Sequence, residues 1–199
     1  MFTGLVQAIG QIESIQASKG DITISINTMH LGLADVGVGD SIAVNGVCLT
    51  ATKVSPTHLK ADVSKETLNV TTGLDKKNQV NLEKALSLND KLGGHLVSGH
   101  VDGVGEVIQF ERTNDCWLLA INAPHEISKY IARKGSICVS GVSLTVNTIE
   151  KDVFTTNIIP HTIEKTTLGK LKVGNQVNLE IDQIARYIER MQQWENEST

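Results

Sequence analysis

The segment SIAVNGVCLT at residues 41–50 recurs as SICVSGVSLT at residues 136–145, an offset of 95 residues. A second segment, NQVNLE at residues 78–83, is repeated without change at residues 175–180. Two copies of so long a period indicate duplicated domains rather than a solenoid of small repeats. Two similar domains can present two similar pockets, as a reaction that joins two copies of one molecule would require.

The composition of the 199-residue chain is that of a globular protein, with 40% hydrophobic and 20% charged residues. A net charge of −4 offers no basic surface, so we expect neither a nucleic acid nor a membrane as partner. No stretch is apolar for long enough to cross a membrane, and the first residues do not resemble a secretory signal. We therefore expect a cytoplasmic protein.

The cysteines and histidines predict neither a disulfide framework nor a metal site. Cys48, Cys116 and Cys138 are odd in number and lack Cys-x-x-Cys spacing, and reduced thiols fit a cytosolic location. His95 and His100 are five residues apart, and residues at this spacing in a strand point to opposite faces. No carboxylate or cysteine completes a familiar metal set, and the glycine-rich spots lack a nucleotide-binding fingerprint.

Both copies are predicted to be short strands separated by glycine and polar turns. Residues 21–27 alternate with period two, and residues 41–54 and 136–149 are rich in Val, Ile and Thr. This pattern predicts an all-β fold with a small barrel or sandwich in each copy. One helix is expected at about residues 124–133, between a proline and a glycine, and its counterpart at residues 29–36 is shorter.

The last segment is the clearest predicted helix and lies outside the repeat. Asp182 is its expected N-cap. Its apolar side chains fall at helical spacing: Ile184, Tyr187, Ile188, Met191 and Trp194. Either they pack on their own barrel or they bundle with copies of the same helix, since the spacing resembles a short heptad seam. We expect an N-terminal domain at 1–95, a C-terminal domain at 96–181 and the helix at 182–199.

Matched positions in the two copies differ in reactive or polar side chains. The pairs are Leu5 with His100, Cys48 with Ser143, Asp62 with Asn157, Ser64 with Ile159, and Glu66 with His161. Because a duplicated scaffold keeps its core and diversifies its sites, this pattern indicates two related pockets with different roles. The threonine pairs Thr50/Thr145 and Thr67/Thr162 fit either a polar ligand face or ordinary strand positions.

Several motifs together resemble riboflavin synthase from residue 1 to about residue 190. They are MFTGLV at 1–6, NGVCLT at 45–50, KETL at 65–68, GGHLVSGHV at 93–101, GVSLTV at 141–146 and IPHT at 159–162. The resemblance implies two tandem six-stranded Greek-key β-barrels followed by a C-terminal α-helix. It also implies a homotrimer held partly by that helix, which favours the bundling alternative.

The implied reaction is the dismutation of two molecules of 6,7-dimethyl-8-ribityllumazine. A four-carbon unit passes from one lumazine to the other, and the products are riboflavin and 5-amino-6-ribitylaminouracil. No metal or organic cofactor takes part. The two lumazines are expected between the N-terminal barrel of one subunit and the C-terminal barrel of the next. Which barrel holds the donor stays open, as does any association with the lumazine-forming enzyme.

The resemblance also implies the residues of the site. In the first barrel, substrate contacts are expected from Gly4, Leu5, Val6, Cys48, Leu49, Thr50, Asp62, Val63, Ser64, Lys65, Glu66 and Thr67. In the second barrel, they are expected from Gly99, His100, Val101, Lys134, Ser143, Leu144, Thr145, Ile159, Pro160, His161, Thr162, Ile163 and Glu164. Residues in or near the chemistry match at Phe2, Cys48, His100, Ser143 and Asp182. Val47 stands where some members have a second cysteine, and His161 where some have glutamate.

The chemistry asks more for positioning than for a strong base. The C7 methyl group of the lumazine is unusually acidic, so holding two substrates face to face is expected to supply most of the rate, about 7–11 kcal/mol in favourable cases. His100 is a candidate proton carrier. Ser143 with Asp182, or Cys48, is the candidate that activates or acts as a nucleophile, and the sequence does not rank them. The alternative function is a lumazine- or flavin-binding antenna protein without catalysis.

Overall fold

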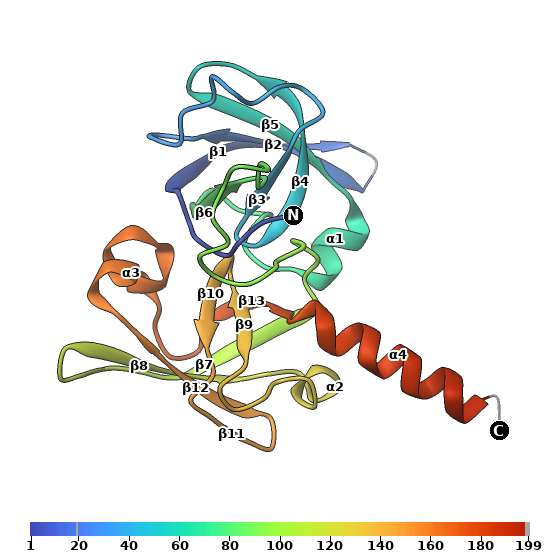
Figure 1. Ribbon diagram of the computed structural model, residues 1–199. Helices are drawn as coiled ribbons and strands as arrows, with labels where there is room; N and C mark the ends of the chain where they lie inside the picture. The colour runs from blue at the N-terminus through green and yellow to red at the C-terminus, as the bar shows by residue number, and fades with distance from the viewer. Residues whose placement is uncertain (19, 198–199) are drawn as a thin grey trace.

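The computed structural model describes residues 1–18 and 20–197 and consists of two β-rich lobes, one above the other in Figure 1, with a C-terminal helix projecting from the lower lobe. The strands of the first lobe are β1 (Ala8–Ser18), β2 (Asp21–Asn27), β3 (Ser41–Val44), β4 (Val47–Val54), β5 (His58–Val63) and β6 (Gln79–Lys84). They close into a barrel in the order β1-β2-β5-β4-β3-β6, and every pair is antiparallel.

The second lobe repeats this order with one strand divided. Its strands are β7 (Gly103–Thr113), β8 (Cys116–Asn122), β9 (Ser136–Val139), β10 (Val142–Thr145), β11 (Thr148–Glu150), β12 (Val153–Ile158) and β13 (Gln176–Ile181). They follow the order β10-β9-β13-β7-β8-β12-β11. At the 95-residue offset, β10 and β11 together correspond to β4, so this sheet has seven strands where its counterpart has six. The prediction of an all-β fold with two barrel-like sheets is confirmed.

Two short helices, α1 (Lys65–Val70) and α3 (Pro160–Lys165), lie at matched places in the two repeats. The second lobe also has α2 (His125–Ser128) and η1 (Thr167–Lys170), and the longer α4 (Gln183–Glu197) follows the last strand. The helix expected at 124–133 is wrong in length, because beyond Ser128 the chain continues in turns such as the one from Gly135 N–H to the Ala132 carbonyl. The segment 29–36 forms turns and no helix. In the part of the chain that is described, no helix is long and apolar enough to cross a membrane.

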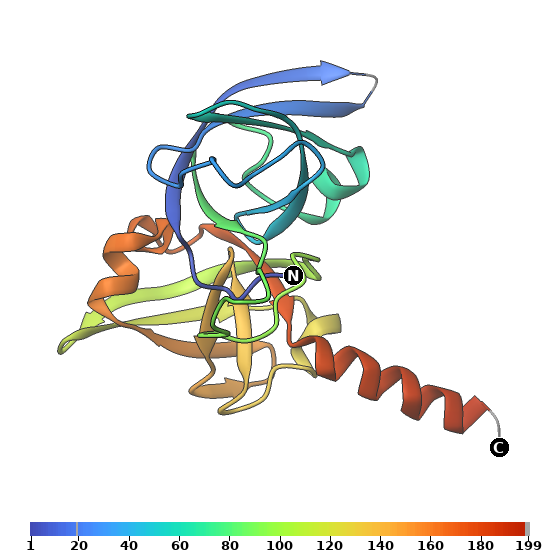
Figure 2. The ribbon, with the colours of Figure 1, turned by 45° about the horizontal axis from the view of Figure 1, so that its top comes forward.

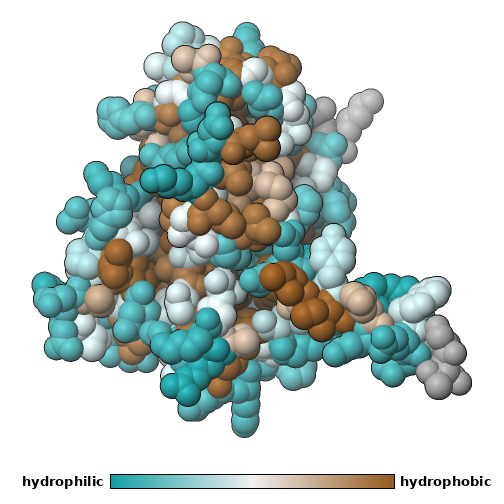
Figure 3. Space-filling view, viewed as in Figure 1, coloured by the Kyte–Doolittle hydropathy of each residue, from teal (hydrophilic) through white to brown (hydrophobic). Residues whose placement is uncertain are grey.

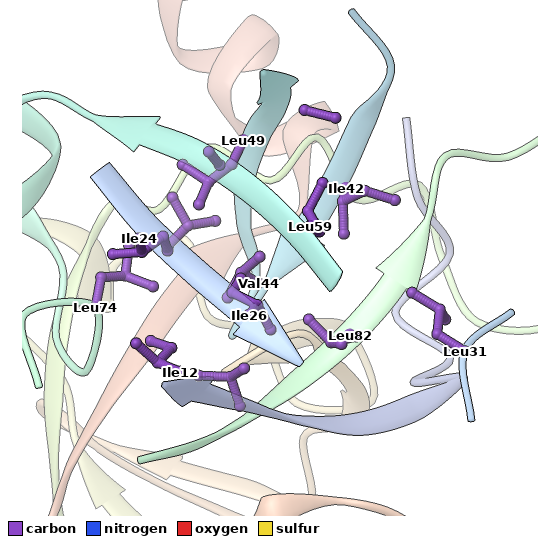
Figure 4. Close-up of a cluster of buried hydrophobic side chains, with 14 of the residues drawn as sticks. Ile12, Ile24, Ile26, Leu31, Ile42, Val44, Leu49, Leu59, Leu74 and Leu82 are labelled. Carbon is purple, nitrogen blue, oxygen red and sulfur yellow. The ribbon is translucent and has the colours of Figure 1, made fainter. Parts of the chain in front are cut away.

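Each lobe has its own apolar core, made from the inward positions of its strands. In the first barrel, Ile26, Val44 and Leu82 are fully buried and gather between the strands (Figure 4). In the second lobe, Ile121 and Phe154 are fully buried in the corresponding core. A third, smaller cluster joins the lobes and contains Phe2, Ala43, Val97 and Cys138. The two repeats are therefore packed directly against each other.

The contact between the repeats is built twice, with nearly the same bonds. The side-chain amide of Asn81 donates to the Ser140 carbonyl (2.8 Å), and that of Asn178 donates to the Asn45 carbonyl (3.0 Å). Both asparagines are 1% exposed, although each occupies an outward position in the alternating pattern of its strand. The outer faces of β6 and β13 are thus the interface between the lobes, close to where the chain crosses from one lobe to the other (Figure 2).

Candidate active site

The opening segment of each repeat lies against a strand of the other repeat. The N–H of Ser143 in β10 donates to the Gly4 carbonyl, and the N–H of Cys48 in β4 donates to the Gly99 carbonyl, both at 2.8 Å. The two glycines have φ of +75° and +79°, and an added Cβ would lie 2.6 Å from the Cβ of Ser143 or Cys48. Glycine is therefore required at both crossings.

The expected site residues lie around two stretches of chain, Thr3–Val6 and Ser98–Val101, that contact the opposite repeat and are called crossing segments below. Gly4, from the first repeat, lies against Ser143 of the second, and Gly99, from the second repeat, lies against Cys48 of the first. The side chain of Val6 packs against the core of the second lobe, and that of Val101 packs against the core of the first. The physical reason is that the chain crosses the interface before it enters each barrel.

Two candidate sites result, each with residues from both repeats. The first site combines Cys48 and Thr50 of β4 with the crossing segment Ser98–Val101. The second site combines Ser143 and Thr145 of β10 with the crossing segment Thr3–Val6. A substitution in one repeat therefore affects the site of the other.

Two buried glutamates hold the crossing segments in place. The carboxylate of Glu83 accepts the N–H groups of Thr3 (2.7 Å) and Gly4 (3.1 Å). The carboxylate of Glu180 accepts those of Ser98 (2.6 Å) and Gly99 (2.9 Å). Burial raises the pKa of both carboxyls, to about 7 for Glu180, against the lowering effect of these backbone N–H groups. The sequence gives no sign of either role, because the NQVNLE repeat has the alternation of an ordinary strand.

The second site contains a serine and a histidine in direct contact. The Ser143 Oγ lies 2.6 Å from the Nδ1 of His95, which is buried. Burial lowers the pKa of His95, while the negative charge of Asp182 opposes that shift. In the tautomer that carries its proton on Nε2, the neutral imidazole accepts the Ser143 hydroxyl at Nδ1, which is the geometry of an activated nucleophile or of a positioned water.

His95 is a third residue that the sequence did not place in the site, because its spacing from His100 was considered only for metal binding. The signal was its position in the GGHLVSGHV motif. Gly94 makes its approach possible, since a Cβ there would lie 2.1 Å from the Thr3 carbonyl oxygen. Asp182 was expected to act with Ser143. The structure instead places its charge near His95 and its carboxylate on the N–H of Ile184 (3.0 Å), at the start of α4.

The other residues expected in the chemistry lie in the first site or beneath it. Phe2 is fully buried and is bonded through its backbone to Val97 (2.7 and 3.0 Å), so it packs under the sites rather than facing them. Cys48 is half-buried above the cluster that contains Phe2. The side chain of His100 is exposed.

Alternation along β4 and β10 separates residues that face a ligand from residues that face the core. Leu49 and Leu144 are buried in the two cores, so only their backbones remain available to a substrate. Thr50 and Thr145, one position further on, are exposed. Their exposure fits both alternatives that the sequence left open, a polar ligand face and ordinary strand positions.

In the first barrel, the expected segment from Asp62 to Thr67 forms the end of β5 and the start of α1. Asp62 is exposed and accepts a hydrogen bond from the Thr23 hydroxyl (2.6 Å), whereas Val63 is buried in the core. Ser64 caps α1 by accepting the N–H of Thr67 (3.1 Å). The side chains of Lys65 and Glu66 are exposed.

In the second lobe, the matching segment from Ile159 to Glu164 forms α3, with Pro160 at its first turn. His161 and Glu164 line a groove of about 660 Å³ together with Val6. Lys165 and Lys170 line the same groove. Ile159 is 53% exposed, Ile163 packs against the core, and the carbonyl of Thr162 accepts the Thr166 hydroxyl (2.7 Å).

Lys134 stands apart from these residues in a turn before β9. Its φ is +67°, and its N–H donates to the Val146 carbonyl (2.8 Å). The described residues include no group of three or more His, Cys, Asp or Glu side chains that could hold a metal ion.

Comparison with known proteins identifies the family. The lumazine binding domain matches twice, at residues 3–85 and 98–182. The chain is 48% identical over 196 residues to riboflavin synthase of Photobacterium phosphoreum, covering 96% of this chain and 88% of the relative. It is 39% identical over 200 residues to riboflavin synthase of Bacillus subtilis, covering 100% and 93%. The chain belongs to the riboflavin synthase family. The riboflavin synthase of Photobacterium leiognathi is 44% identical over 204 residues, covering 100% and 94%.

Solved structures agree with this family assignment at the level of the fold. The structure of LumP complexed with riboflavin has a TM-score of 0.83 at 29% identity, covering 91% of this chain and 99% of that one. The structure of LumP complexed with 6,7-dimethyl-8-(1'-D-ribityl) lumazine has a TM-score of 0.80 at 28% identity, covering 90% and 98%. A protein of this architecture thus binds both a lumazine and a flavin.

Proposed function

We propose that the protein makes riboflavin by dismutation of two 6,7-dimethyl-8-ribityllumazine molecules, the reaction expected from its family. One lumazine gives a four-carbon unit to the other, and 5-amino-6-ribitylaminouracil is the second product. The observation that carries the proposal is the contact between Ser143 Oγ and His95 Nδ1 beside a crossing segment, in a chain that matches riboflavin synthases over its full length.

Ser143 and His95 are the proposed proton-handling pair of the second site. His95 takes a proton from the Ser143 hydroxyl, or from a water held by it, so that an oxygen adds to C7 of one lumazine. Asp182 stabilises the imidazolium that forms, because its negative charge favours the protonated ring. When the oxygen leaves again, the proton returns to it.

The first site is proposed to bind the second lumazine with a different set of groups. Cys48 occupies the position of Ser143, and the exposed His100 projects from the crossing segment beside it. The two sites thus differ in the strand residue, Cys48 or Ser143, and in the nearby histidine, His100 or His95. This difference suits two identical molecules with opposite roles as donor and acceptor.

Enforced proximity of the two lumazines is proposed as the main catalytic effect. We propose that the protein is a homotrimer in which the first site of one subunit faces the second site of the next. The supporting observation is α4, where Ile184, Tyr187, Ile188, Met191 and Trp194 are each 51–68% exposed. Figure 3 shows hydrophobic surface on α4 where it leaves the second lobe.

The direct test is a turnover assay with purified protein and the lumazine, followed by riboflavin absorbance. Replacing Ser143 or His95 (Ser143→Ala, His95→Gln) is expected to lower kcat by about 10²–10⁴-fold while lumazine binding is kept. Ser136→Ala, in the neighbouring strand β9, is the control. Near-native turnover in both variants would contradict the assigned roles. Tight lumazine binding by the wild-type protein with no riboflavin formed would support the antenna alternative.

A further inference from the structure

The crossing segment that carries His100 is held at both ends by the chain that leads into α4. At its start, Glu180 accepts the N–H groups of Ser98 and Gly99. At its end, Asp102 donates its N–H to the Leu179 carbonyl (2.8 Å), and its carboxylate accepts the N–H of Ile181 (2.9 Å). The crossing segment therefore lies alongside the last residues of β13.

Asp102 also forms an ion pair with the first turns of α4. The Arg186 guanidinium lies 3.0 and 3.1 Å from the two oxygens of the Asp102 carboxylate. The Asp102 side chain is only 12% exposed, so it has little water to solvate its charge. Burial raises the pKa of Asp102, and the Ile181 N–H and Arg186 act in the opposite direction. Arg186 is thus the cation that compensates a largely buried carboxylate.

The first repeat provides an internal comparison for this ion pair. Gln7 is the counterpart of Asp102: its N–H donates to the Leu82 carbonyl (2.9 Å), and its side-chain oxygen accepts the N–H of Lys84 (2.9 Å). A neutral amide therefore satisfies the same backbone bonds. The negative charge at position 102 is needed only for the additional contact with Arg186, which has no counterpart in the first repeat because α4 lies outside the duplication.

A second anchor fixes α4 on the same lobe without touching the crossing segment. Glu189, one turn further along the helix, contacts Lys129 and Tyr130 in the turn after α2. The two anchors allow the effect of the Asp102 contact to be separated from simple attachment of the helix.

We infer that Asp102 and Arg186 are positioning residues that couple the seating of α4 to the placement of the His100 crossing segment in the first site. The inference rests on the proposed function for its kinetic consequence. Because α4 is also the proposed trimer contact, this ion pair links assembly with the shape of a substrate site. Neither residue needs to touch the lumazine for the coupling to act.

The kinetic test is a double-mutant cycle with Asp102→Asn and Arg186→Gln. The asparagine keeps an oxygen for the Ile181 N–H, removes the charge and replaces the oxygen that faces Arg186 with an NH2 group. Each single variant is expected to lower kcat/KM about tenfold. The kcat/KM of the double variant is expected to be no lower than that of the less active single variant. Lys129→Gln, which removes the ion pair of the other anchor and leaves the bond from Tyr130 to Glu189, should keep the wild-type kcat/KM. Unchanged kinetics in Arg186→Gln, or strictly additive losses, would overturn the inference.

A structural readout keeps the test independent of turnover. Hydrogen exchange is expected to accelerate in the peptide that covers residues 98–101 in Arg186→Gln and to stay unchanged in the peptide that covers residues 3–6. Equal acceleration in both peptides, or none in either, would overturn the coupling. If the wild-type protein made no riboflavin, the proposed function would fail, while hydrogen exchange would still decide whether α4 positions the segment.

Discussion

Replacement of Glu180 by glutamine tests the crossing-segment architecture through its pH dependence. The carboxyl is 2% exposed, and burial, reinforced by the nearby charge of Asp102, raises its pKa from 4.5 to about 7. Since the pKa is raised in the folded state, the folded protein binds this proton more tightly than the unfolded chain. The stabilisation is fully present below pH 4.5 and is lost as the pH rises through about 7.

The expected size follows from the same shift. Each pKa unit corresponds to about 1.36 kcal/mol, so wild type should lose about 3 kcal/mol of unfolding free energy relative to Glu180→Gln between pH 4.5 and pH 8. In Glu180→Gln, the side-chain NH2 group faces one of the two backbone N–H groups that the carboxylate accepts. This contact between two donors destabilises the variant by an amount that does not depend on pH.

The assay is urea unfolding at fixed protein concentration, followed by tryptophan fluorescence at several pH values from 4.5 to 8. Glu111→Gln, an exposed position on β7, controls for the chemical change itself. Titrating groups that do not interact with Glu180 are common to both proteins and cancel in the difference, whereas Asp102, whose charge acts on Glu180, contributes to it. A difference between wild type and Glu180→Gln that does not change with pH would refute the reasoning.

Three further predictions follow from the same structure. Gly99→Ala should destabilise the protein and reduce kcat/KM, because its Cβ would lie 2.6 Å from the Cβ of Cys48. Gly20→Ala is the steric control, since Gly20 also has a positive φ and the nearest atom to its added Cβ is 3.7 Å away. Equal losses of thermal stability in the two variants would contradict the contact between Gly99 and Cys48. Phe2→Ala should cost about 3–5 kcal/mol of unfolding free energy by removing a fully buried ring, and a loss below about 1 kcal/mol in urea unfolding would show that the cluster between the lobes is not a core. Ile188→Asp should dissociate the proposed trimer in sedimentation experiments, whereas Arg190→Gln on α4 should not; an unchanged assembly would exclude α4 as the contact.

The sequence predicted the repeated all-β architecture because both copies carry period-two alternation and the same glycine turns. The family was also predicted, from motifs that span nearly the whole chain, and comparison with known relatives confirms it. The C-terminal helix was predicted from its spacing and is confirmed as α4. These are features that local pattern encodes.

What the sequence did not predict depends on contacts between distant residues. Asn81 and Glu83 occupy alternate positions that normally face solvent, yet they are 1% and 4% exposed because the other repeat covers them. Gly4 and Gly99 were recognised as motif residues, but nothing local shows that each lies against the opposite barrel. His95 is paired with Ser143 across 48 residues of sequence. The six-residue helices α1 and α3 are too short to give a periodic signal.

The most direct measurement is the stoichiometry of the reaction with 6,7-dimethyl-8-ribityllumazine as the only added reactant. If two lumazines are held together and exchange a four-carbon unit, one riboflavin and one 5-amino-6-ribitylaminouracil should appear for every two lumazines consumed. Riboflavin formed from single lumazines, or lumazine that stays bound and unconverted by the folded protein, would contradict the account.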